Sequence, residues 1–237
     1  MPSPLTIVLP IYEGVTHLDF TGPHQVFVRL PGARVLVASL MGKPVHADGL
    51  HFSSLACLEE IATCDVLCVP GGAGCVAALE DERFLGQIRR LGHSARYVTS
   101  VCTGSLILGA AGLLAGKRAT CHWAFRDLLP LFGAIPADGR VVRDGNLMTA
   151  GGVTAGIDFA LALIAELAGE ELAQSIQLGL EYAPAPPFAS GRPEQAPAQI
   201  YAAVSGRIAA ESVDRRARLH AFAAAQKARS RGAATGQ

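Results

Sequence analysis

Short runs of β-branched and other apolar residues alternate with longer amphipathic stretches along about the first 170 residues. Glycine follows many of these runs, an order typical of parallel strands connected by crossover helices. The pattern predicts strands at Thr6–Leu9, Arg34–Ser39, Val66–Val69 and Tyr97–Val101, and weaker strands at Arg118–Cys121, Val141–Arg143 and Leu147–Thr149. It predicts helices at Pro23–Arg29, Glu82–Gly92, Ser105–Leu114, Ala124–Leu131 and Thr154–Ala168. We therefore expect an α/β fold around a mostly parallel sheet.

Turn and proline signals divide the rest of the chain. Val45–Ser53 has Asp48-Gly49 at its centre, which predicts a small antiparallel hairpin. Ala183–Pro197 holds five of the 14 prolines, too many for a helix or a central strand, so it reads as an extended connector. The stretch from Ala198 to roughly Arg229 is rich in alanine and arginine and predicts a helix. We expect an α/β domain at residues 1–197 and a helical tail at residues 198–237.

Charge is balanced over the whole chain but not along it. Lys plus Arg and Asp plus Glu number 20 each, so nothing favours binding to a phosphate backbone, and we expect no nucleic-acid partner. From Ser205 onward the chain has seven basic residues and only two acidic ones, Glu211 and Asp214, which gives this part a net charge of +5. We interpret it as a solvated helix face that lies on the body or on a second subunit, with an acidic partner as the alternative.

Composition and the ends of the chain indicate a folded protein of the cytosol. Half of the 237 residues are apolar and 17% are charged, which excludes a disordered chain. Met1–Pro10 has no basic segment and no cleavage site of a secretory signal, so we expect a cytoplasmic protein. Tyr97–Gly116 has 20 residues without a charge, the length of a membrane span. Its four glycines instead predict a strand, a tight turn and a buried helix, so we expect no membrane contact.

The six cysteines should be reduced in such a protein. They show no C-x-x-C spacing, so we expect no metal. Five of them are interpreted as small buried hydrophobic residues: Cys57, Cys64, Cys68, Cys75 and Cys121. Cys102 differs because a predicted strand runs into it and Thr103-Gly104-Ser105 begins a helix directly after it. Such an elbow presents a nucleophile at the carboxyl edge of a sheet, and a helix start favours the thiolate; the alternative is a buried cysteine in an ordinary turn.

Two further segments should reach the same edge of the sheet. Gly71 and Gly72 lie in a glycine turn after the strand Val66–Val69, where bare backbone amides, with that of Thr103, can stabilise charge on a substrate. Asp19 follows the first strand and is either an acid/base group or a helix cap. Two neighbouring histidines, His17 and His24, are minor candidates.

Three segments together, VTHLDFTGPHQVF, VPGGAGCVAALED and YVTSVCTGSLILGAAGLLAGKRATCHW, resemble the ThiJ/PfpI superfamily, whose fold is that of the class I glutamine amidotransferases. The resemblance spans roughly Leu5 to Pro197, and within the superfamily the chain is most similar to the isocyanide hydratases. It also includes Val141–Asp158 and Leu180–Phe188. The resemblance implies a flavodoxin-like or Rossmann-like sandwich with a mostly parallel central sheet and a cysteine nucleophile elbow.

The resemblance also implies an activity and its residues. A homodimer without metal or organic cofactor would add water to a small-molecule isocyanide, R–NC, and release an N-substituted formamide. Cys102 would be the nucleophile, Asp19 the acid/base carboxylate and Thr103 the elbow threonine. Peptidase-like and glyoxalase-like members usually have histidine directly after the nucleophile or glutamate in place of Asp19, which argues against a Cys-His dyad here. His122 is a candidate for the pocket, or else a satisfied histidine beside a buried Trp123.

Two other functions remain open. One is a glyoxalase or deglycase of the same superfamily that uses the same cysteine. The other is the ligand-sensing domain of a transcription regulator, because some regulators attach this fold to helix-turn-helix modules. Only 40 residues follow Pro197, too few for two modules of roughly 50 residues each, so this reading ranks last.

Overall fold

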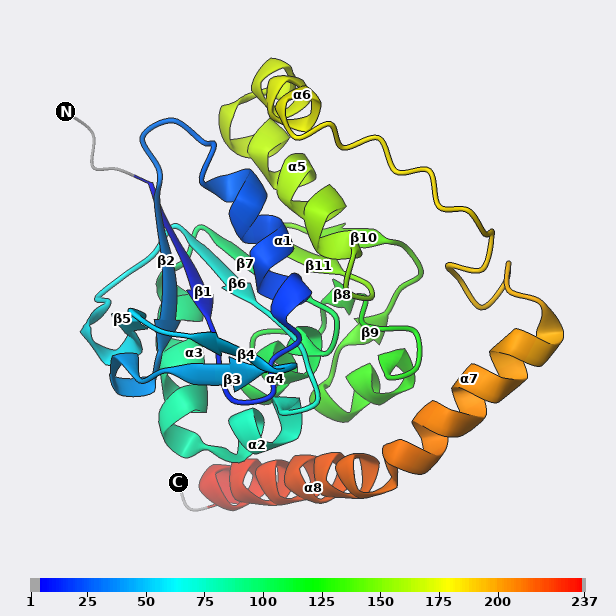
Figure 1. Cartoon of the computed structure of the whole chain (residues 1–237). Coiled ribbons are helices and arrows are strands. Elements are labelled where there is room, and N and C mark those ends of the chain that lie inside the picture. Colours follow the sequence, from blue (N-terminus) through cyan, green and yellow to red (C-terminus); the bar gives the residue numbers. More distant parts are fainter. Residues whose placement is uncertain (1–4, 236–237) are drawn as a thin grey trace. The chain divides into compact units, whose positions relative to one another are not determined.

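A seven-stranded sheet forms the centre of the computed structural model, which describes residues 5–235 (Figure 1). The strand order is β10-β11-β7-β6-β1-β2-β5, and β10 alone among these strands runs antiparallel, against β11. The strands are β1 (Thr6–Pro10), β2 (Arg34–Ser39), β5 (Ala56–Cys57), β6 (Val66–Val69), β7 (Tyr97–Val101), β10 (Val141–Asp144) and β11 (Leu147–Ala150). The expected α/β fold with a mostly parallel sheet is confirmed.

The strongest strand predictions coincide with the observed strands. Strands β6 and β7 have the predicted bounds, and every residue in both is buried. Strand β6 is a continuous apolar run, as expected for a strand covered on both faces, whereas β7 is rich in β-branched residues and buries the polar Thr99 and Ser100. The two-residue strand β5 was not predicted, because so short a pairing has no periodicity to detect.

Helices cover both faces of the sheet (Figure 1). On one face lie α1 (His17–Phe27) and α5 (Ala155–Ala168), with α6 (Glu170–Gly179) packed on α5. Buried Phe27 and Phe159 meet edge to face between α1 and α5, with 5.9 Å between ring centroids. The other face carries α2 (Cys75–Glu80), α3 (Glu82–Ser94) and α4 (Gly104–Ala110). Helices α2 and α6 were not predicted.

Three predicted helices differ from the observed ones for local reasons. Helix α1 begins six residues before Pro23, which lies inside the helix and does not start it. Helix α4 ends early because Gly112 adopts φ +81°, a conformation typical of a helix end. The predicted helix Ala124–Leu131 is a 3₁₀ helix, η3 (Arg126–Phe132), which contains Pro130.

Short elements connect the strands at the sheet edges. The predicted hairpin is present as β3 (Val45–Ala47) and β4 (Leu50–Phe52). The predicted strand Arg118–Cys121 is only the two-residue β8 (Arg118–Ala119), which pairs with β9 (Ile135–Pro136) outside the main sheet. Two 3₁₀ turns, η1 (Leu40–Gly42) and η2 (Leu58–Glu60), follow β2 and β5.

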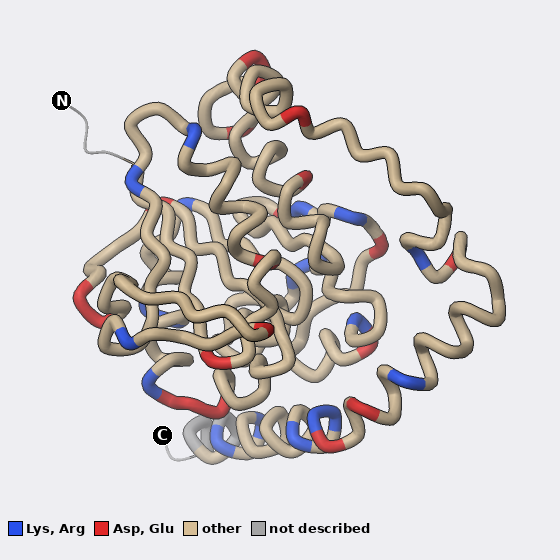
Figure 2. The backbone as a smooth tube through the Cα atoms, viewed as in Figure 1, with Lys and Arg blue, Asp and Glu red and all other residues tan. Residues whose placement is uncertain are grey.

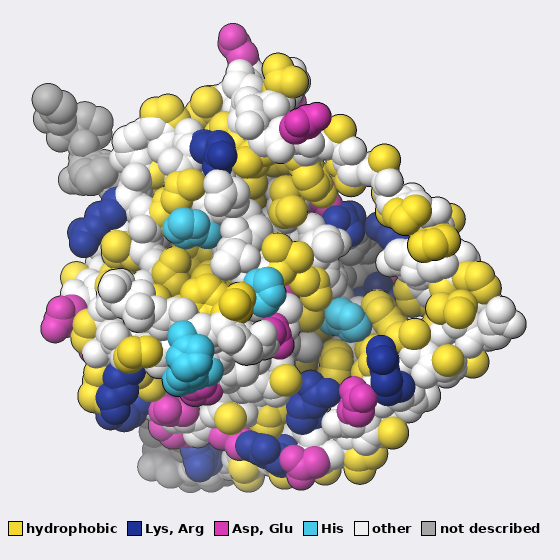
Figure 3. Space-filling model, viewed as in Figure 1, with side chains coloured by type: hydrophobic (Ala, Val, Ile, Leu, Met, Phe, Trp, Pro, Cys, Tyr) yellow, Lys and Arg dark blue, Asp and Glu magenta, His cyan; other side chains and the backbone are white. Residues whose placement is uncertain are grey.

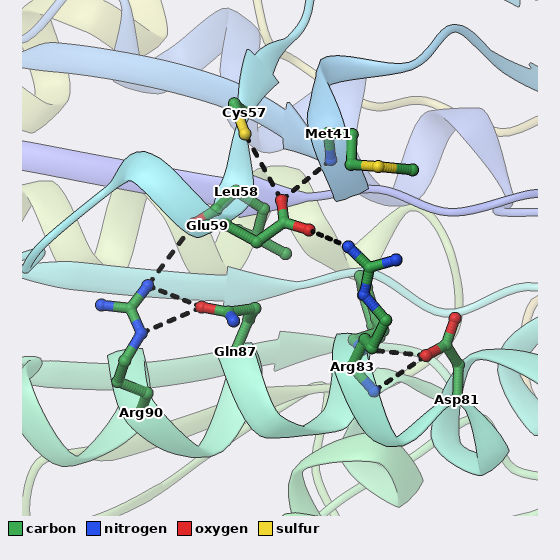
Figure 4. A network of polar contacts seen from close by, with 9 residues as sticks. Met41, Cys57, Leu58, Glu59, Asp81, Arg83, Gln87 and Arg90 are labelled. Carbon is green, nitrogen blue, oxygen red and sulfur yellow. Dashed lines mark hydrogen bonds and ion pairs between the residues drawn. The ribbon is translucent and has the colours of Figure 1, made fainter.

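A polar network ties η2 to α3 (Figure 4). Glu59 accepts the amide of Met41 at 2.8 Å and forms an ion pair with Arg83 at 3.2 Å. Arg90 donates to backbone carbonyls of η2 and of the loop after it. These contacts join the connection after β5 to the helix that covers this side of the sheet.

The chain divides into two compact units, Met1–Leu180 and Glu181–Gln237. In the second unit, the predicted connector Ala183–Pro197 contains no helix or strand. The predicted tail helix is two helices, α7 (Ala198–Glu211) and α8 (Val213–Thr235), because the chain leaves helical geometry at Ser212. The Ser212 hydroxyl donates to the carbonyl of Ala209 there, and such side-chain bonds compete with the helix. Lys and Arg recur along α8, whereas α7 has Arg207 alone (Figure 2).

None of the helices that the structure describes is both long enough and apolar enough to cross a membrane. Tyr97–Gly116, which has the length of a span, forms β7, the turn after it and α4, as its glycines predicted.

Candidate active site

Cys102 stands at a sharp turn between β7 and α4. Its φ of +58° lies in the left-handed region, which costs a residue with a side chain ~1–3 kcal/mol. The Cys102 amide donates to the carbonyls of Ala150 and Gly151, at 3.1 and 2.8 Å, so the end of β11 holds the turn in place. Gly104 is needed after it, because a Cβ there would lie 2.1 Å from the carbonyl oxygen of Val69. The predicted elbow is therefore present.

Two consecutive amides of the glycine turn after β6 orient the polar side chains beside the cysteine. The Gly71 amide donates to Oδ2 of Asp19 at 2.9 Å, and the Gly72 amide donates to Oγ1 of Thr103 at 3.0 Å. From the sequence we expected the Gly72 amide to stabilise charge on a substrate, which stays a prediction; in this structure the amide binds Thr103. The two glycine amides position Asp19 and Thr103.

The glycine turn is itself fastened to the loop between β1 and α1. The Thr16 amide donates to the carbonyl of Gly71 at 2.9 Å, and the Gly74 amide donates to the carbonyl of Gly14 at 3.0 Å. Gly72 adopts φ +145°, and a Cβ on it would lie 2.4 Å from the Thr16 nitrogen. The two loops can approach this closely only because residue 72 carries no side chain.

Asp19 is fully buried in the first turn of α1, although the cap position belongs to Thr16. Burial raises the pKa of Asp19 to about 7, although hydrogen bonds from the Gly71 amide and the Cys102 thiol lower it. Its second oxygen, Oδ1, has no hydrogen-bond partner among the described residues. A helix-capping role does not explain a buried carboxyl group at this position.

The Cys102 thiol is also held in its neutral form. Burial, the charge of Asp19 and the nearby thiol of Cys121 raise the pKa of Cys102 well above its usual value. Hydrogen bonds from the amides of Thr103 and Val153 to the sulfur have the opposite effect and lower the pKa of Cys102. We expected the helix start to favour a thiolate, but these two amides do not outweigh the burial.

The titrations of Asp19 and Cys102 are coupled. Burial raises both pKa values, so each group is a weaker acid here than in water. Because the groups interact, both titrations belong to the pair.

His122 lies near the elbow. Among the residues that the structure describes, it forms no hydrogen bond with Cys102, Asp19 or Thr103. Its Nδ1 accepts the amide of Ala124 at 3.2 Å, and burial lowers its pKa. A Cβ on Gly152 would lie 3.0 Å from the His122 ring, so the ring covers the loop that follows β11. The neighbouring Trp123 is half-buried, not buried as we expected.

The other two histidines of this region lie on α1 outside the Asp19 contacts. His17 is the first residue of α1, and His24 lines a groove of about 730 Å³ between α1, β2 and the segment around β4. Phe20 and Phe52 meet edge to face in this groove, at 5.0 Å between ring centroids. Figure 3 shows histidine side chains on this face, over α1 and the β3–β4 hairpin.

A smaller cavity of about 270 Å³ is lined in part by the loop after β1. Its walls include Tyr12, Gly74 and Phe84, whereas Cys102 and Asp19 do not line it. The wall formed by Tyr12 and Gly74 belongs to the loops that hold the glycine turn.

All six cysteines are free thiols, and four of those we expected to be buried are buried. Cys57 is the exception, because it is half-buried and its thiol donates to the Glu59 carboxylate at 3.4 Å (Figure 4). Burial also raises the pKa of Cys68 to about 12.

Sequence reasoning missed Tyr12, Gly151 and Val153. The Tyr12 hydroxyl binds the carbonyl of Pro70, which is 58 residues away in the sequence. Gly151 and Val153 follow β11 and contact Cys102 through their backbone atoms. The only available signal was position, since all three follow predicted strands at the carboxyl edge of the sheet.

Comparison with known proteins gives consistent matches. A model of the DJ-1/PfpI family matches residues 5–166. The chain is 55% identical over 197 residues to an isonitrile hydratase of Pseudomonas putida, which covers 83% of this chain and 86% of that protein. It is 29% identical over 174 residues to the glutathione-independent glyoxalase DJR-1.2 of Caenorhabditis elegans, covering 72% and 91% of the two chains. A crystal structure of a ThiJ/PfpI family protein from Pseudomonas syringae superposes with a TM-score of 0.87 and 43% identity, over 92% of this chain and 90% of that one.

Proposed function

The chain belongs to the DJ-1/PfpI family, and from that premise we propose that it is an isonitrile hydratase, a hydro-lyase that converts an isonitrile (isocyanide), R–NC, into an N-substituted formamide. The observation that carries this proposal is the buried Asp19 carboxyl group at the Cys102 elbow, where Gly71 lies between Asp19 and Thr103. It provides one nucleophile and one group that moves a proton, and addition of water to a terminal isonitrile carbon requires both.

In the first step the Asp19 carboxylate takes the proton of the Cys102 thiol as sulfur bonds to the isonitrile carbon. Asp19 then delivers this proton to the same carbon, which gives a thioimidate, R–N=CH–S–Cys102. A carboxyl group with a pKa of about 7 suits both directions of transfer near neutral pH.

In the second step water attacks the thioimidate carbon while Asp19 acts as base. The nitrogen gains a proton, the C–S bond breaks, and the thiol recovers its proton as R–NH–CHO leaves. No electrons are transferred overall, so the reaction balances with water alone. Thr103, held by the Gly72 amide, keeps its backbone amide beside the sulfur throughout.

Product formation from two substrates tests the proposal. We expect the purified protein to release N-cyclohexylformamide from cyclohexyl isocyanide and to form little lactate from methylglyoxal. Activity on methylglyoxal alone would instead support a glyoxalase, the second candidate, which the match to the nematode glyoxalase favours. Asp19 and Thr103 argue against it, because glyoxalase-like members usually have glutamate or histidine at these positions.

A homodimer and a cytoplasmic location are part of the same proposal. Light scattering of the purified protein tests the dimer, which should have twice the 24.6 kDa chain mass. A single-chain mass would remove the dimer and leave the chemistry of Cys102 unaffected.

A further inference from the structure

Tyr12 reaches the glycine turn with its hydroxyl group. It follows β1, its side chain is buried, and its ring meets that of Phe84 edge to face at 5.4 Å between centroids. The hydroxyl donates to the carbonyl oxygen of Pro70 at 2.9 Å. The fixed ring therefore holds the hydroxyl at one position in the loop.

The peptide group that Tyr12 contacts is the one that contacts Asp19. The carbonyl of Pro70 and the amide of Gly71 are two ends of a single planar unit. Tyr12 donates to the carbonyl end, and the amide end donates to Oδ2 of Asp19 at 2.9 Å. A hydrogen bond to the carbonyl polarises the peptide group and makes its N–H a stronger donor. It also prevents rotation of the peptide plane away from Asp19.

We propose that Tyr12 is a positioning residue that orients and polarises the Pro70–Gly71 peptide and so stabilises the Asp19 carboxylate in its proton-transfer position. The proposal rests on the proposed function, in which this carboxylate moves the proton of Cys102. Tyr12 acts through the peptide group and needs no contact with the substrate.

The hydroxyl remains a donor throughout the range in which Asp19 titrates. Burial and the nearby groups Cys75, Asp19 and Cys102 raise the pKa of Tyr12 well above its usual value. Tyr12 is therefore neutral wherever the Asp19 carboxyl changes its charge, and its hydrogen bond to Pro70 persists on both sides of that change.

The Tyr12→Phe variant removes the hydroxyl and keeps the ring. We expect the midpoint of the Asp19 titration, followed by the ¹³C signal of its carboxyl group, to move upward by about 0.5 to 1 pH unit, because the weakened Gly71 donor stabilises the carboxylate less. Turnover of the isonitrile should fall roughly tenfold, the loss expected for a weakened acid/base group. Tyr97→Phe is the control, since Tyr97 is as buried as Tyr12 and lies at the end of β7 away from Cys102. It should change neither quantity.

Two results would overturn the proposal. One is an unchanged Asp19 midpoint in a folded Tyr12→Phe protein; the other is an equal shift in both variants. If the Tyr12→Phe variant is too unstable to titrate, hydrogen exchange of the Gly71 amide is measured under native conditions. We expect faster exchange in Tyr12→Phe than in Tyr97→Phe. Equal exchange in the two variants would contradict the proposal. The titration uses no isonitrile, so a protein that makes no formamide yet shows the shift would refute the proposed function and leave the role of Tyr12 intact.

Discussion

Replacing Asp19 with asparagine should make the protein more stable at neutral and alkaline pH while it removes activity. Asparagine retains an oxygen that can accept the Gly71 amide, so the hydrogen bond at 2.9 Å is preserved. It has no charge to bury and no proton to transfer. Stability and turnover should therefore change in opposite directions.

The magnitude follows from the Asp19 pKa, which burial raises from 3.8 to about 7. Between about pH 4 and about pH 7 the folded protein binds more protons than the unfolded chain, so the free energy of unfolding falls as pH rises through this window. A rise of about 3 in pKa corresponds to a loss of ~4 kcal/mol, complete above the folded-state pKa. The Asp19→Asn variant lacks this loss.

Urea denaturation at several pH values measures the effect. The stability difference, variant minus wild type, should grow from pH 4 to pH 8 by up to ~4 kcal/mol, with turnover lower by at least ~100-fold. Asp65→Asn is the control, because its carboxylate accepts the Thr6 amide at the other end of β1. A difference that does not grow with pH, or an active variant, would refute the reasoning on Asp19.

Four further outcomes follow from the same geometry. Cys102→Ala should abolish formamide release in a folded protein while Cys121→Ala retains it; the reverse result would move the nucleophile to Cys121. Gly71→Ala should reduce activity and stability, because its Cβ would lie 2.4 Å from the Thr103 nitrogen, whereas Gly86→Ala, with nothing within 4 Å, should do neither. Turnover should rise with pH through about 7 as Asp19 ionises, and a flat profile of kcat against pH would contradict its role as base. A chain ended at Ser212, without α8, should be less stable or less dimeric by light scattering yet retain turnover, and a folded dimer without activity would contradict this.

The sheet and the elbow could be predicted because their signals are local. Val66–Val69 is apolar at every position, Tyr97–Val101 is rich in β-branched residues, and Cys102 follows the second strand directly. The start of α1 was misjudged because proline usually occupies the first turn of a helix, whereas Pro23 lies inside this one.

The relations within the site are not written in any local pattern. The bond between Tyr12 and Pro70 spans 58 residues and depends on where two loops meet. The acidity of Asp19 and Cys102 depends on how deeply both groups are buried, and a helix start in the sequence carries no information on that burial. Residue types at the carboxyl edge can be read from sequence, but desolvation requires the packed structure.

Intact-protein mass spectrometry during turnover tests the central claim most directly. The Asp19→Asn protein, slowed in both proton transfers, is incubated with cyclohexyl isocyanide beside wild-type and Cys102→Ala protein. We predict an adduct with the full mass of the isonitrile, located to the peptide that contains Cys102, in the wild type or Asp19→Asn protein and absent from Cys102→Ala. Formamide production by Cys102→Ala, or an adduct on another cysteine, would contradict covalent hydration at Cys102.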